Sequence, residues 1–166
     1  MNRKAKLLGH PIHQMLIVFP LGLLATGVVF DLITLISGSA AWSGAAFYMI
    51  GAGILGGLLA AVFGLWDWTT IPAGTRAKRV GAWHGIGNVV VVVLFSASWM
   101  LRYNNAAVPS SVALAFSFVA AMLALVTGWL GGELVDRLGV GVDANANLNA
   151  PSSLKDRSYD DHTRAA

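Results

Sequence analysis

Four long apolar segments dominate the hydrophobic pattern of this 166-residue chain. They cover residues 12–36, 45–66, 81–101 and 111–131, and most charged residues lie between them or at the two ends. Each segment is close to the ~20 residues that cross ~30 Å of hydrocarbon as an α-helix. Because no segment alternates between apolar and polar positions, the pattern predicts an all-α fold of four transmembrane helices rather than buried strands.

Small residues recur every four positions in the second and fourth apolar segments. The second segment carries Ala52, Gly56, Ala60 and Gly64, and the fourth carries Ala120, Ala124, Gly128 and Gly132. In lipid, such stripes allow helix backbones to approach closely. Since the connections are short, neighbouring helices should be antiparallel, which predicts an integral membrane up-down-up-down four-helix bundle over residues 1–142. Residues 143–166 are polar and without apolar periodicity, so we expect a disordered C-terminal tail.

Composition agrees with a membrane protein and excludes several other classes. The chain is 56% hydrophobic and only 11% charged, whereas soluble domains carry about 25% charged residues. So few charges could not cover the surface of a soluble monomer. The chain contains no cysteine, which excludes disulfides, thiolate metal sites and a cysteine nucleophile.

The positions of the basic residues predict an orientation and exclude nucleic-acid binding. Ten of the eleven Lys and Arg residues lie at the N-terminus, between the second and third segments, or in the C-terminal region, and only Arg102 lies in the other set of loops. By the positive-inside rule, both termini are expected in the cytoplasm. The basic residues are therefore expected to anchor the chain at the lipid surface.

Six polar residues are expected to gather at the cytoplasmic end of the bundle. They are His10, His13, Asp67, His84, Asn88 and Glu133. Ionisable residues at such places are candidates for a functional site. His10 and His13 are three residues apart, and His84 and Asn88 are four apart, so each pair would share a helix face if the chain is helical there.

Two further features concern the first and third apolar segments. Asp31 lies near the outer end of the first segment, and Arg102 lies just after the third, so a structural ion pair between them is expected. Pro20 cannot donate a backbone hydrogen bond and should kink the first helix.

Two kinds of cofactor site are compatible with the polar cluster. A b-type haem needs two neutral imidazoles on different helices, for which His13 and His84 are the main candidates and His10 and Asn88 are nearby. A non-haem site for Zn, Fe or Mn would use imidazoles together with carboxylates. Its candidate ligands are His10, His13, His84, Asp67 and Glu133. No serine motif accompanies the histidines, so no catalytic residue is assigned and enzymatic activity is left open.

The function classes that remain are three. The first is electron transfer through a haem or redox metal near the cytoplasmic face, in contact with a membrane redox partner or within a homo-oligomer. The second is an accessory or assembly subunit that binds no cofactor. The third is a transporter or metal-responsive protein that uses the same histidines, against which the apolar middle of each segment argues because it interrupts a continuous polar path.

Three motifs carry a resemblance to a known family. They are GHPIHQMLIVFPLGLLATGVVFDL near the N-terminus, WHGIGN in the third segment and GWLGGELVDRLGVGV, which begins at the end of the fourth. Over about residues 7 to 142 the chain resembles the bacterial predicted membrane proteins of domain of unknown function 2231. The resemblance implies a four-helix integral membrane protein without an established activity. Members joined to redox modules such as Rieske-type domains imply electron transfer, and the family's recurring polar positions match His10, His13, Asp31, His84, Asn88 and Glu133.

Overall fold

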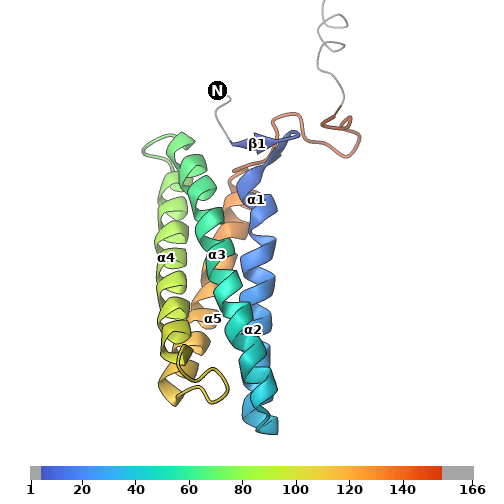
Figure 1. The fold of residues 1–166 in the computed structure, drawn as a ribbon. Coiled ribbons are helices and arrows are strands. Elements are labelled where there is room, and N and C mark those ends of the chain that lie inside the picture. The colour runs from blue at the N-terminus through green and yellow to red at the C-terminus, as the bar shows by residue number, and fades with distance from the viewer. Residues whose placement is uncertain (1–4, 155–166) are drawn as a thin grey trace, which may run out of the picture.

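The computed structural model describes residues 5–154 and consists mainly of long helices (Figure 1). A two-residue strand pair opens the chain, with β1 (Lys6–Leu7) antiparallel to β2 (His10–Pro11). The helices that follow are α1 (Ile12–Leu16), α2 (Val18–Ser37), α3 (Ala40–Thr70), α4 (Arg76–Arg102) and α5 (Ser111–Gly132), and α5 continues into one π-helical turn, η1 (Glu133–Arg137). In Figure 1 the chain descends through α1 and α2, ascends in α3, descends in α4 and ascends in α5.

Four helical stretches are long and apolar enough to cross a membrane. They are Ile12–Ser37, Ala40–Thr70, Arg76–Arg102 and Ser111–Arg137. The expected all-α fold with four spans is therefore confirmed, although the helices extend beyond the apolar segments. The hydroxyl of Thr75 accepts a hydrogen bond from the Lys78 backbone N–H, and the hydroxyl of Ser110 accepts one from Ala113, so polar residues cap the starts of α4 and α5.

The helix is interrupted at Ile17, three residues before Pro20, where the sequence predicts a kink. Regular helix ends at Leu16 and resumes at Val18. A proline has no N–H for the carbonyl four residues earlier, and its ring crowds that carbonyl. For Pro20 that carbonyl belongs to Leu16, where the helix is interrupted.

Most of the large apolar side chains face outwards, and the core is narrow. Leu55, Met122 and Leu125 are each about two-thirds exposed or more, at 70%, 66% and 69%. Surfaces of this kind are covered by lipid in a membrane protein. The central core consists of Ile50, Val91, Phe95 and Ala120.

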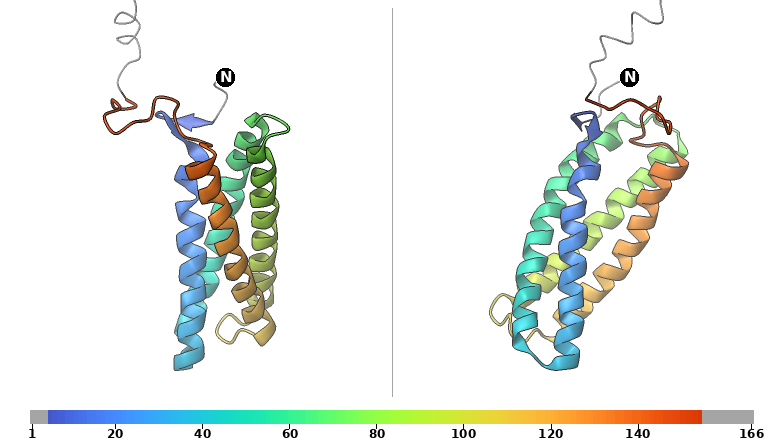
Figure 2. Two further views of the ribbon diagram at one scale, coloured as in Figure 1. Left: turned by 180° about the vertical axis from the view of Figure 1, so that it is seen from behind. Right: turned by 90° about the vertical axis from the view of Figure 1, so that its right-hand side faces the viewer.

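The bundle is built from two helical hairpins. Within the described residues, α2 packs mainly against α3, and α4 packs mainly against α5. The right-hand view of Figure 2 shows the two hairpins side by side. We call the end where α1 and α4 begin the histidine end, and the opposite end, where α2 and α4 finish, the ion-pair end.

A fully buried ion pair joins the hairpins at the ion-pair end. Asp31 of α2 and Arg102 of α4 are both 0% exposed. The Arg102 Nη1 and Nη2 atoms donate to the two Asp31 carboxylate oxygens at 2.5 and 2.8 Å. Ser98 accepts from Arg102 Nε at 3.2 Å, and Ser117 of α5 donates to Asp31 at 3.1 Å. The ion pair expected from the sequence is thus present, and its polar atoms are surrounded by partners.

The segment after η1 lies beside the N-terminal strands (Figure 2, left). Lys6 forms an ion pair with Asp143 at 3.5 Å, and the Ser153 hydroxyl donates to the Leu8 carbonyl at 3.1 Å. Residues 143–154 contain turns without a helix or strand. The remainder of the expected disordered tail, 155–166, lies outside the described residues.

Removing one member of the buried ion pair should strongly destabilise the bundle. We expect Arg102→Met to lower the free energy of unfolding by about 3–5 kcal/mol, because Asp31 would be left as an uncompensated buried charge. Unfolding of the purified protein in mixed micelles with increasing dodecyl sulfate measures this change. The double variant Asp31→Asn with Arg102→Met should lose less of its free energy of unfolding than Arg102→Met does. Arg79→Met, at an exposed position, should lose little. Equal stability of Arg102→Met and Arg79→Met would refute a structural role for the pair.

Candidate functional site: a histidine pair between two hairpins

The His13 imidazole is held against α3 at the histidine end. Its Nδ1 lies 2.9 Å from the Ala60 carbonyl oxygen. A carbonyl oxygen only accepts hydrogen bonds, so Nδ1 carries the proton and the Nε2 lone pair is directed elsewhere. The ring rests on Gly64, where an added Cβ would lie 2.8 Å from Cε1 of His13.

The His84 imidazole is held against α5 in the same manner. Its Nδ1 lies 2.9 Å from the Thr127 carbonyl oxygen, which again requires the proton on Nδ1. Its ring rests near Gly131, where a Cβ would lie 3.1 Å from Cε1 of His84. Both rings are partly buried.

These two imidazoles meet across the boundary between the hairpins. Their ring centroids are 6.4 Å apart, and the ring planes are inclined at 87°. Two imidazoles bound to one metal from opposite sides would have centroids about 6.2 Å apart, from metal–nitrogen bonds of about 2.0 Å and a ring radius of about 1.1 Å. The observed centroid separation is close to this distance.

The two hairpins place their polar residues at equivalent positions. His84 follows His13 by 71 residues, and Arg102 follows Asp31 by 71 residues. In the second helix of each hairpin the shift is 67 residues, both from the Ala60 carbonyl to that of Thr127 and from Gly64 to Gly131. The two hairpins therefore repeat one arrangement. His13 of the first hairpin is equivalent to His84 of the second, and Asp31 is equivalent to Arg102. From the sequence alone, the two halves share little beyond a histidine near the start of each first helix.

Asn88 breaks this equivalence. It lies one turn after His84 on the same face of α4, as the spacing predicts, and its Nδ2 donates to the His84 carbonyl at 2.8 Å and approaches His84 Nε2 at 3.2 Å. The Thr127 hydroxyl lies 3.1 Å from Asn88 Oδ1. The equivalent of Asn88 in the first hairpin is Ile17, which has no such polar group.

Three other candidate residues are placed away from the pair. His10 and His13 do not share a helix face, because the condition for it is not met: Pro11 is extended (φ −62°, ψ 123°) and the helix begins only at Ile12. His10 is exposed in β2 and lies 3.3 Å from the Ser153 hydroxyl. Asp67 accepts a hydrogen bond from the Ala5 backbone N–H, and Glu133 pairs with Arg76 at 2.6 Å.

The ligands available limit which cofactor fits. Across residues 5–154, no group of three or more His, Cys, Asp or Glu side chains lies close enough to hold a metal ion. The ligands expected for a non-haem site therefore do not form one metal site within the described part of the chain. They are His10, His13, His84, Asp67 and Glu133. A zinc site needs at least three protein ligands, whereas a haem supplies four nitrogens of its own and requires only axial ligands. The histidine pair fits the second kind of group.

Four residues of the site were not among the candidates from the sequence. Ala60 and Thr127 act through backbone carbonyls, which every residue possesses, so side-chain chemistry gave no signal. Gly64 and Gly131 belong to or adjoin the small-residue stripes, and those stripes were interpreted as helix packing alone. The recurrence of the same spacing after each histidine is the signal that could have identified them.

Together, the fold and the site define a four-span membrane protein in which a histidine pair joins two equivalent hairpins. The chain belongs to the DUF2231 family, described as predicted membrane proteins, whose family model matches residues 9–144. No curated protein and no solved structure matches the chain.

A methyl group at Gly64 should disturb the histidine site. Because its Cβ would lie under 3 Å from two atoms of the His13 ring, we expect Gly64→Ala to destabilise the protein by about 1–3 kcal/mol through overpacking. Gly44→Ala, in the same helix with no atom within 4 Å of the added Cβ, should be neutral or slightly stabilising, as alanine favours helix. Unfolding in mixed micelles compares the two variants. If both behave alike, the close packing of His13 on Gly64 is not a constraint.

Proposed function

We propose that the chain binds one b-type haem through Nε2 of His13 and Nε2 of His84 and serves as a one-electron carrier in the membrane. The observation that supports this most strongly is the pair of imidazoles with ring centroids 6.4 Å apart, each with Nδ1 bonded to a backbone carbonyl. Histidine ligands are typically oriented by such a bond, which fixes the tautomer and makes the other nitrogen a better ligand. A bound haem would supply the one-electron chemistry.

The chain's own residues would hold and orient the group. Ala60 and Thr127 fix the tautomer of the two imidazoles through their carbonyls, and Gly64 and Gly131 leave room for the rings. The apolar core of Ile50, Val91 and Phe95 lies on the other side of the site from solvent and limits access of water from the ion-pair end. A low-polarity surrounding of this kind is one of the factors that tune a redox potential.

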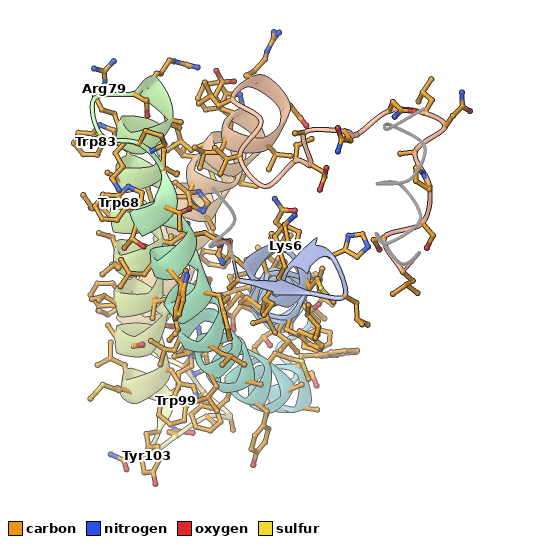
Figure 3. The ribbon with its side chains drawn as sticks, turned by 90° about the horizontal axis from the view of Figure 1, so that it is seen from above. Lys6, Trp68, Arg79, Trp83, Trp99 and Tyr103 are labelled. Carbon is orange, nitrogen blue, oxygen red and sulfur yellow. The ribbon has the colours of Figure 1, made fainter. Side chains whose placement is uncertain are left out.

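Charged residues around the histidine end support a particular place in the cell. Figure 3, which views this end, shows Trp68, Arg79 and Trp83 along α3 and α4 and Lys6 at the N-terminal strands. Lys78 lies 3.8 Å above the Trp68 ring and donates to the Trp68 carbonyl. Tryptophan residues of this kind lie at a membrane interface, and the basic residues favour its cytoplasmic side. We therefore propose a bacterial inner-membrane location, with the histidine end and both termini in the cytoplasm.

The distribution of polar groups favours an electron carrier over a transporter. Polar clusters lie at both ends of the bundle, but the core between them is formed by apolar side chains. A substrate or ion path would need polar groups along its length, whereas an electron can be exchanged at one face. Since neither Asp31 nor Arg102 is a haem ligand, the proposal includes one redox centre, and a membrane partner would complete transfer across the bilayer.

Absorption spectroscopy of the purified protein tests the proposal. After expression with sufficient haem, the wild-type protein should show a Soret band and sharp α and β bands on reduction with dithionite. His13→Ala and His84→Ala should each lose this six-coordinate spectrum, since each removes one axial ligand. His10→Ala should retain it, because His10 lies outside the pair.

A wild-type protein without pigment after such expression would contradict the proposal and favour an accessory subunit that binds no cofactor. Retention of the full six-coordinate spectrum by either His13→Ala or His84→Ala would show that haem is bound elsewhere.

A further inference from the structure

The two histidines of the site differ in the hydrogen-bond partners of their Nε2 atoms. His13 has one hydrogen bond among the described residues, through Nδ1 to Ala60. His84 has the corresponding bond to Thr127 and, in addition, the Asn88 amide at 3.2 Å from Nε2. The nitrogen that would bind a metal is thus already satisfied in His84.

The Asn88 amide is fixed in the orientation that donates to His84. Its Nδ2 has the His84 backbone carbonyl as a second acceptor at 2.8 Å, which identifies this end of the amide as the nitrogen. Its Oδ1 lies 3.1 Å from the Thr127 hydroxyl. Thr127 is itself buried, at 2% exposed, so the network cannot exchange its partners for water freely.

The internal repeat shows that this network belongs to only one half of the site. The fold repeats the histidine, the carbonyl and the glycine in both hairpins, but it places Ile17 where the second hairpin has Asn88. An imidazole that leaves a metal needs another partner for its buried lone pair, since an unsatisfied polar group costs about 1–3 kcal/mol. His84 has this partner and His13 does not.

We propose that His84 is the exchangeable ligand of the histidine pair and that Asn88 is the positioning residue that receives it, so that the site accepts a small neutral molecule on the His84 side. This inference rests on the proposed haem site. The exchange breaks the coordinate bond from His84 Nε2 and forms one to the incoming molecule. The freed lone pair of Nε2 accepts the Asn88 Nδ2–H, and the proton on Nδ1 stays in its bond to Thr127, so no proton or electron is transferred.

Carbon monoxide is a suitable probe, because it binds reduced haem iron only where a ligand position opens. We expect the dithionite-reduced wild-type protein to bind carbon monoxide, seen as a shift of its Soret band. Asn88→Leu should weaken the affinity about tenfold, equivalent to about 1.4 kcal/mol, because it removes the bond that stabilises released His84. Thr127→Val, which keeps the carbonyl but loses the hydroxyl that orients Asn88, should weaken it less.

Two controls separate this role from a general effect on folding. Gln14→Leu removes another amide at the histidine end, one that donates to the Val140 carbonyl, and should leave the affinity unchanged. His84→Ala should bind carbon monoxide at least as tightly as the wild type while haem stays on His13, whereas His13→Ala should lose most of its haem.

The outcomes distinguish this inference from the proposed function. If the reduced protein keeps its two-histidine spectrum unchanged under saturating carbon monoxide, or if Asn88→Leu and the wild type bind it equally, the exchange role is wrong and the two-histidine haem site stands. If the wild-type protein binds no haem, both proposals are wrong.

Discussion

The bidentate contact between Asp31 and Arg102 is the interaction on which the arrangement of the two hairpins depends. In lipid, a buried charge must find its partner within the protein, and these two side chains are 0% exposed. Each of them follows a histidine by 18 residues, which is about five helical turns and therefore the same helix face. Pairing the ions at one end consequently places His13 opposite His84 at the other, and the apolar core fills the space between.

The sequence was sufficient to predict the four spans and the Asp31–Arg102 pair, because segment length and charge in lipid each have a strong physical consequence. The pattern did not predict that Pro11 would be extended, and this changed the place of His10. It also could not assign carbonyl acceptors, since the backbone oxygens of Ala60 and Thr127 are chemically ordinary. Equivalent residues of the two hairpins are 71 positions apart in the first helix of each hairpin and 67 apart in the second. Because no single spacing relates the two halves, the repeat was not visible from the sequence.

The repeat also explains how one small bundle can combine a rigid site with an adaptable one. Equivalent carbonyls and glycines hold both imidazoles in one tautomer, which requires no rearrangement when a ligand bond forms. The asymmetry is confined to the position shared by Ile17 and Asn88, and there a single amide provides an alternative partner for His84. On the proposed haem site, this difference would make His13 the fixed ligand and His84 the releasable one.

The central claim of the proposed haem site is that His13 and His84, whose ring planes are inclined at 87°, would together hold the haem iron. Electron paramagnetic resonance of the oxidised wild-type protein tests this claim most directly. Nearly perpendicular axial imidazoles give a low-spin ferric signal of very large anisotropy, whereas parallel imidazoles give an ordinary rhombic signal. The account predicts the strongly anisotropic low-spin signal, and its loss in His13→Ala and in His84→Ala. A high-spin signal, a rhombic one or the absence of any haem signal from the wild-type protein would contradict it.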